Sequence, residues 1–257
     1  MRRSESRGGL RPWSPALTLN AWLRWEAVDR LLPPRARDVL EVGCGQGAFG
    51  VRLSRRYRYL GIEPDARSFA VARARLAKEG GDGAVRNGDL SILAPEEMFD
   101  VVCAFEVIEH IDDDRAAIAA WIGRLRPEGR LIVSAPAWQH RFAAADEMVG
   151  HFRRYDPSDL RRLLSDAGLE DVEIVRFGAP LGFALEALRN AMGRRRRLRT
   201  ADESRETRTA ASGRLLQPSD GVVAFVVYLV VLPFRKLQRA FPNRGPGVIG
   251  VGRRPAP

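Results

Sequence analysis

Three ionisable residues stand close together near the middle of the chain, in the segment Glu106-Val-Ile-Glu-His110. They follow Phe99–Phe105, a continuous apolar run that predicts a strand buried on both faces. Burying such groups without a purpose is costly, so we expect them to face a cleft where this strand ends. His110 is the expected proton acceptor because its ordinary pKa lies near neutrality, and Glu109 and His151 are the other candidate catalytic groups.

A glycine-rich turn occurs earlier, within Val39-Leu-Glu-Val-Gly-Cys-Gly-Gln-Gly-Ala-Phe-Gly50. Glycines at positions 43, 45 and 47 let the backbone turn tightly and approach a ligand. Glu63 ends the next predicted strand, where a carboxylate can accept hydrogen bonds from both ribose hydroxyls. The pattern predicts a nucleoside cofactor without saying which one, since Gly45-x-Gly47-x-x-Gly50 also matches the dinucleotide fingerprint.

The elements that must position these groups alternate along the chain. Strands are predicted at 38–42, 59–63, 85–87, 99–105, 130–135, 172–177 and 247–252. Helices are predicted at 18–32, 46–57, 65–78, 113–125 and 157–167, the last opened by Asp156 as N-cap. Such alternation predicts an α/β, Rossmann-like fold with a mostly parallel seven-stranded sheet and helices on both faces. Ligands of such sheets bind at the carboxyl ends of the strands, so the two motifs should meet there.

The alternation stops at residue 181 and resumes at residue 245. We therefore expect a domain of residues 16–180 and 245–253, a disordered tail at 1–15 and a helical, basic insertion at 181–244 before the last strand. The insertion holds a basic run at 194–197, a polar stretch at 200–213 and an apolar run at 221–234. That run is shorter than the ~20 residues of a bilayer span. It could form a lid, a dimer contact or, through 221–239, a membrane-surface segment, or it could simply pack against the domain.

The composition bears on two questions: which partners the protein binds and in which cellular compartment it lies. The net charge is +10 and only two lysines occur, Lys78 and Lys236, so arginine carries the excess. This predicts an anionic partner or merely a solvated basic surface. Cys44 and Cys103 form no CxxC pair, so we expect reduced thiols and no structural zinc. The first residues lack the apolar core of a secretory signal, and a cytoplasmic location follows as the default expectation.

Several motifs together resemble one family. Glu41-Val-Gly-Cys-Gly-Gln-Gly47 resembles the E/D-x-G-x-G-x-G signature of class I S-adenosylmethionine-dependent methyltransferases. Gly61-Ile-Glu-Pro-Asp65, Asn87-Gly-Asp-Leu90, the 99–110 segment and Leu125-Arg-Pro-Glu-Gly-Arg-Leu-Ile-Val133 resemble its further landmarks in order, with Glu128 where a second glycine is usual. Within that family the chain resembles ubiquinone-pathway O-methyltransferases and the methyltransferase type 11 group. The resemblance implies S-adenosyl-L-methionine as cofactor, held by Glu41, Gly43, Cys44, Gly45, Gly47, Glu63, Pro64, Asp89, Leu90 and Glu106.

The resemblance extends to the ionisable segment at 106–110. Glu-x-x-Glu-His is similar to the metal-binding segment of the ubiquinone-pathway enzymes and of small-RNA 3′-end 2′-O-methyltransferases. It implies Mg²⁺ or Mn²⁺ held by Glu106, Glu109, His110 and His151. The alternative is that the second acid and the histidine cap the next helix or bond nearby backbone, with no metal.

Four residues further along could border the acceptor pocket: Trp138, Arg153, Arg154 and Tyr155. Arginines there would suit a phosphate or carboxylate on the substrate, or they could pair with neighbouring acids.

The resulting expectation is an enzyme that methylates oxygen of a small or lipid-linked acceptor by in-line transfer. An RNA 2′-O-methyltransferase is a second hypothesis, which requires a basic groove and convergence of all four metal-candidate residues. An NAD(P)-binding protein or a non-catalytic scaffold is the third. We rank nucleic acid below a small-molecule acceptor, and the sequence predicts no oligomeric state.

Overall fold

The computed structural model describes residues 13–79, 81–197 and 221–256. In this part of the chain seven strands form one sheet of order β3-β2-β1-β4-β5-β7-β6. Their bounds are β1 Asp38–Val42, β2 Arg58–Glu63, β3 Gly83–Asn87, β4 Phe99–Phe105, β5 Leu125–Pro136, β6 Glu170–Phe177 and β7 Gly247–Arg253. β7 runs antiparallel to β5 and β6, and the other pairs are parallel. The predicted Rossmann-like α/β sheet is confirmed.

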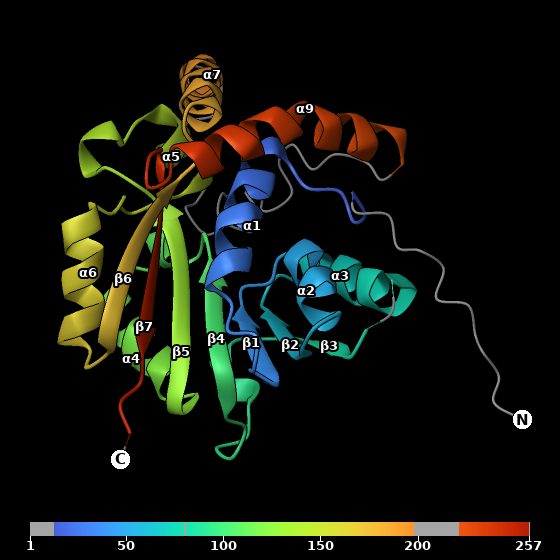
Figure 1. The fold of residues 1–257 in the computed structure, drawn as a ribbon, viewed down its shortest axis with the longest axis vertical. Coiled ribbons are helices and arrows are strands. Elements are labelled where there is room, and N and C mark those ends of the chain that lie inside the picture. Colours follow the sequence, from blue (N-terminus) through green and yellow to red (C-terminus); the bar gives the residue numbers. More distant parts are fainter. Residues whose placement is uncertain (1–12, 80, 198–220, 257) are drawn as a thin grey trace, which may run out of the picture.

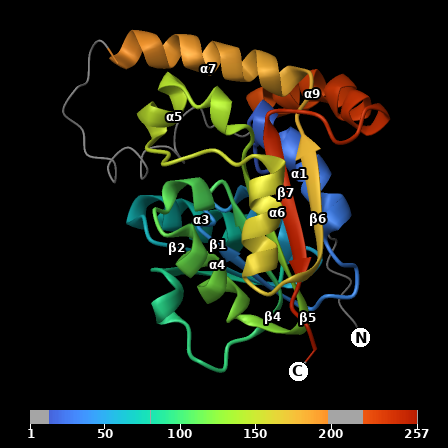
Figure 2. The ribbon, with the colours of Figure 1, turned by 90° about the vertical axis from the view of Figure 1, so that its left-hand side faces the viewer.

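Helices cover both faces of this sheet. Their bounds are α1 Leu19–Leu31, α2 Ala48–Ser54, α3 Ala66–Glu79, α4 Asp114–Ile122, α5 Ala144–Val149, α6 Pro157–Asp166, α7 Leu181–Arg197 and α9 Val222–Ala240. One buried core joins α1, α2 and α3 to the sheet, and a second core on the opposite face joins α4 and α6 to it. The two layers are visible in Figures 1 and 2.

Three local features depend on tertiary contacts that the sequence does not reveal. Leu125 was expected in a helix but begins β5, where it pairs with Phe99. Asp156 stands at the N-cap position of α6, yet its carboxylate accepts from the Gln139 N–H rather than from the helix. The short helix α5 was not predicted. Its Ala145 N–H donates to Asn190 of α7, a contact that no local periodicity signals.

The described part of the expected tail is packed against the body. Residues 1–12 lie outside the described residues. Trp13 contacts Phe225 of α9 with ring centroids 4.8 Å apart, and the Ser14 hydroxyl donates to Glu79 at 2.8 Å. The expected tail is therefore too long by residues 13–15.

The described part of the insertion forms two helices at one end of the molecule. α7 and α9 lie across the carboxyl ends of the parallel strands, above α1 in Figure 1 and along the top of Figure 2. The predicted polar stretch at 200–213 falls outside the described residues. None of the helices in the described ranges is both long and apolar enough to cross a bilayer.

Candidate active site

A cavity of about 350 Å³ lies where β1 and β4 end, beneath α1, α5 and α7. The glycine loop lines it through Gly43, Cys44 and Gly45. Glu106, His110 and His151 line it as well, and Arg24 of α1 and Arg189 of α7 add two cations. The fold thus brings the two predicted motifs to one hollow, as expected for parallel strands that end at the same edge.

The glycine loop and the acid of the neighbouring strand are joined directly. Glu63 Oε2 accepts from the Gly45 N–H at 2.8 Å, and Oε1 accepts from the Asp65 N–H at 2.9 Å. Burial raises the pKa of Glu63, which these two hydrogen bonds partly oppose. Gly45 has φ +54°, and a Cβ built there would meet no atom within 4 Å. The backbone therefore leaves open space for a ligand beside the carboxylate, which is the cradle that a nucleoside needs.

Glu41 is a buried carboxyl group at the end of β1. It accepts from the Tyr59 hydroxyl at 2.6 Å. Burial raises its pKa to about 8, and the negative charge of Glu63 adds to the shift although the Tyr59 hydrogen bond opposes it. Because Glu41 also lines the cavity, a cation bound there would favour its ionised form. An ionised Glu41 is the partner that the positively charged amino group of the cofactor's methionine part would require.

Other predicted cofactor residues lie outside the cavity lining. Gly47, Glu63, Pro64, Asp89 and Leu90 are absent from its walls. The exposed Asp89 carboxylate accepts from the Ser91 backbone and hydroxyl, which lowers its pKa. Their contact with an adenosine stays a prediction.

Tyr59, which closes the site behind Glu41, was missed by the sequence reasoning. A tyrosine inside a predicted strand carries no signal that separates it from ordinary core.

A second group of side chains, at the exit of β4 and before α6, borders the same cavity as the glycine loop. Ligand atoms of Glu109, His110 and His151 all lie within 4.8 Å of one another. Glu109 is 0% exposed and neither of its carboxylate oxygens has a hydrogen-bond partner. Burial, with Glu106 nearby, raises its pKa well above the usual range. An unsatisfied buried carboxyl group is expensive and therefore points to a ligand or to chemistry.

Asp146 of α5 orients His151. His151 Nδ1 lies 2.9 Å from Asp146 Oδ1, and its Nε2 lies 3.8 Å from Glu109 Oε1. Burial alone would raise the Asp146 pKa, but hydrogen bonds from His151 and Arg154 lower it to about 2. An ionised Asp146 selects the tautomer that protonates Nδ1, which leaves the Nε2 lone pair facing the cluster.

Two predictions for this segment need correction. Burial, together with the neighbouring His151, lowers the pKa of His110 to about 3, so His110 is a poor proton acceptor. Glu106 stands apart from the three-residue cluster: at φ 57° its carboxylate accepts from the Ser134 hydroxyl at 3.1 Å and pairs with Arg24 at 3.3 Å. Among the described residues only three of the four predicted metal ligands converge.

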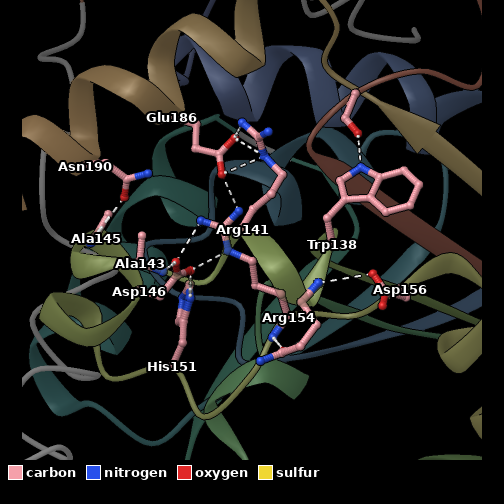
Figure 3. A network of polar contacts seen from close by, with 12 residues as sticks. Trp138, Arg141, Ala143, Ala145, Asp146, His151, Arg154, Asp156, Glu186 and Asn190 are labelled. Carbon is pink, nitrogen blue, oxygen red and sulfur yellow. Dashed lines mark hydrogen bonds and ion pairs between the residues drawn. The ribbon is translucent and has the colours of Figure 1, made fainter.

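A buried ion-pair network backs the cluster (Figure 3). The Arg154 guanidinium donates to both oxygens of Asp146, at 2.9 and 2.7 Å, and also pairs with Glu186 of α7. Arg141 binds Glu186 at 2.8 Å. The network ties the insertion helix to the segment that carries His151. Asp146 and Glu186 were missed by the sequence reasoning, which offers no signal for partners 8 and 32 positions from Arg154.

Of the four predicted acceptor residues, Arg154 alone lines the cavity within the described chain. Arg153 binds Asp114 at 2.8 Å and Asp112 at 3.3 Å. The Tyr155 hydroxyl donates to Asp114 at 2.8 Å, and Trp138 Nε1 donates to the Gly245 carbonyl at 3.1 Å. Each therefore has a structural partner, and pairing with neighbouring acids was the better of the two expectations.

Comparisons with known proteins agree with this geometry. Residues 20–174 match a family model described as "Methyltransferase domain". A probable S-adenosylmethionine-dependent methyltransferase of Mycolicibacterium smegmatis is 35% identical over 159 residues, 59% of this chain and 60% of its own length. A ubiquinone biosynthesis O-methyltransferase of Idiomarina loihiensis is 30% identical over 172 residues, covering 58% and 69%. The chain thus spans about three fifths of the first relative's length.

A solved structure adds evidence for the fold. The N-methyltransferase NodS from Bradyrhizobium japonicum, in complex with S-adenosyl-L-homocysteine, aligns with TM-score 0.52 and 17% identity over 91% of this chain and 85% of that one. At that identity the likeness establishes the fold, and the site must be argued from its own residues.

Proposed function

This chain belongs to the methyltransferase-domain family, and from that premise we propose that it transfers the methyl group of S-adenosylmethionine to an oxygen of a small or lipid-linked acceptor. One observation carries the proposal. A single cavity has the open glycine loop on one wall and His110 and His151 on the other, with Glu109 behind them. A sulfonium methyl held by the loop would lie in the same cavity as His151, whose Nε2 is available to take a proton from a hydroxyl.

The reaction is an in-line displacement. The acceptor oxygen bonds to the methyl carbon as the carbon–sulfur bond breaks, and S-adenosylhomocysteine leaves with the sulfur electron pair. The hydroxyl proton passes to His151 Nε2, and Asp146 stabilises the imidazolium that forms. The cavity supplies orientation and excludes water, which is most of what an already activated methyl donor requires.

A divalent cation fits the Glu109–His110–His151 cluster. The fit rests on the unpartnered Glu109 carboxyl, the converging imidazoles and the Asp146 hydrogen bond behind His151. One carboxylate with two imidazoles suits Mn²⁺ better than Mg²⁺, which prefers oxygen ligands. Such an ion would occupy the Nε2 lone pair of His151, so it would polarise the acceptor oxygen and lower the pKa of its hydroxyl in place of proton transfer to His151. Calorimetry with Mn²⁺ alone tests the fit: binding that His151→Ala abolishes supports it, and absence of binding leaves His151 as the base without metal.

The RNA 2′-O-methyltransferase hypothesis requires all four predicted metal ligands to converge. That requirement is not met, because Glu106 does not join the other three residues. The small or lipid-linked acceptor is therefore retained as the better-supported substrate class.

The activity test uses methyl-labelled S-adenosylmethionine with a panel of catechols, prenylated phenols and glycolipids. We expect label in an ether-linked methyl group of at least one acceptor. A Gly45→Val variant fills the open space over the loop and should lose transfer. Gly168→Val is the matched control, because Gly168 also has positive φ and open space but lies at the α6–β6 turn. Equal activity in both variants would contradict the assignment, as would a panel without transfer.

A further inference from the structure

The helix α9 is fixed to the body by one face only. Val231 is fully buried, and Tyr228 packs on Trp22 of α1 with ring centroids 5.1 Å apart. The buried Gln238 donates to the Leu23 carbonyl at 3.0 Å and accepts from the Gly178 N–H at 2.7 Å. These contacts hold α9 in one orientation, so its opposite face is a fixed surface of the protein.

That opposite face is apolar and exposed. Val222, Val226, Leu229, Val230 and Leu237 recur at helical spacing along it, and their exposed fractions range from 37% to 77%. Across the described chain, ten of the twelve strongly exposed large apolar side chains belong to α7, α9 or the Phe241 that follows α9. Apolar surface concentrated in this way marks an interaction site.

The exposed charges on the described residues of α7 and α9 are all positive. α9 contains no acidic residue, and the single acid of α7, Glu186, is buried in the Arg154 network. Lys236 and Arg194 on the helices are exposed. A hollow beside them is lined by Arg141, Arg176 and Arg244, among others. Exposed apolar side chains flanked by cations, with the acid buried, complement an anionic lipid surface.

We propose that the outer face of α7 and α9 docks on the surface of an anionic lipid bilayer. No described helix can span a membrane, so α9 would lie in the interface plane with its apolar stripe among the headgroups and upper acyl chains. A second copy of the chain is a poorer occupant, because a two-fold contact through this face would bring two basic surfaces together.

This surface lies over the candidate active site. α7 contributes Glu186 and Arg189 to the cavity wall, while Leu188 and Met192 of the same helix face outward. A docked enzyme would hold its cavity next to the bilayer, where a lipid-linked acceptor resides. That link rests on the proposed function, whereas the docking itself does not.

The test is co-sedimentation of the full chain with vesicles, without cofactor or acceptor, so that its outcome is independent of the methyl-transfer proposal. Vesicles of phosphatidylcholine mixed with phosphatidylglycerol should bind the protein, and phosphatidylcholine alone should bind it far less. The Val226→Glu, Leu229→Glu double variant should bind at least about tenfold more weakly. Val71→Glu, on the exposed face of α3, is the matched control and should bind like the unaltered protein.

Replacing exposed basic residues measures the electrostatic contribution to vesicle binding. A Lys236→Gln, Arg244→Gln variant should lose about fivefold in binding per cation, and added salt should produce the same trend. Circular dichroism and thermal unfolding confirm that each variant is folded. Equal binding to both vesicle types, or no binding together with a dimer in analytical ultracentrifugation that Val226→Glu, Leu229→Glu dissociates, would overturn the proposal.

Discussion

The two walls of the cavity are built in different ways. The cofactor wall exposes the backbone of the glycine loop, and the Gly45 N–H of that loop donates to the Glu63 carboxylate, which does not itself line the cavity. The opposite wall consists of side chains from β4's exit, α5, α7 and the loop before α6, held by the Asp146–Arg154–Glu186 network. A wall made of backbone should tolerate most side-chain changes, whereas a wall made of paired charges should fail when one partner is removed.

The largest effect is expected at the chemical group itself. His151→Ala should lower kcat by about 10²- to 10⁴-fold, because the proposed proton acceptor is lost, while S-adenosylmethionine should still bind at the glycine loop. His140→Ala is the control, since His140 is exposed and outside the cluster. Steady-state kinetics on a panel acceptor and calorimetry measure the two quantities. Loss of cofactor binding in His151→Ala would show that the walls are not separate.

The next largest effect concerns stability. Arg154→Met leaves Asp146 and Glu186 buried without their shared cation, which should cost about 3–5 kcal/mol in the free energy of unfolding. Its neighbour provides the comparison: Arg153→Met removes a more exposed pair with Asp112 and Asp114 and should cost at most about 1 kcal/mol. Urea denaturation measures both. If both variants lost a similar amount of unfolding free energy, the buried network would not stabilise the fold more than the exposed ion pairs do.

The corresponding change beside the glycine loop should weaken cofactor binding, and it also removes the acceptor of the Gly45 and Asp65 N–H groups. Glu63→Ala should weaken S-adenosylmethionine binding by about 1–3 kcal/mol, since the carboxylate proposed to accept from the ribose is lost. Glu96→Ala, an exposed acid elsewhere, is the control. Titration calorimetry gives the affinities, and unchanged affinity in Glu63→Ala would count against the ribose assignment.

The smallest effect is a pH dependence. Burial holds the pKa of Glu41 at about 8 in the free protein, so at pH 7 this group is mostly protonated. A cationic amino group favours the carboxylate and lowers the Glu41 pKa, so binding should release a proton at pH 7, strengthen as the pH rises towards about 8 and gain nothing further from Glu41 above it. Calorimetry in buffers of different ionisation heat detects that proton. Proton release that persists undiminished in Glu41→Gln would show that another group is responsible.

The contrast between the two walls also explains which features could be predicted from the sequence. Alternating apolar segments and the glycine loop are local signals, and β1 and β4 begin and end at the predicted residues. Glu63 could be placed because neighbouring parallel strands end together. Asp146 and Glu186 could not, since only tertiary packing brings α5 and α7 to Arg154. The pKa of His110 was likewise misjudged, because burial beside His151 cannot be read from residue type.

The most direct test of the account is calorimetric titration of the protein with S-adenosylmethionine and, separately, with NAD. We expect S-adenosylmethionine to bind with a stoichiometry near one and NAD to give no saturable heat. Saturable NAD binding without S-adenosylmethionine binding would contradict the assignment of this cavity to a methyl donor.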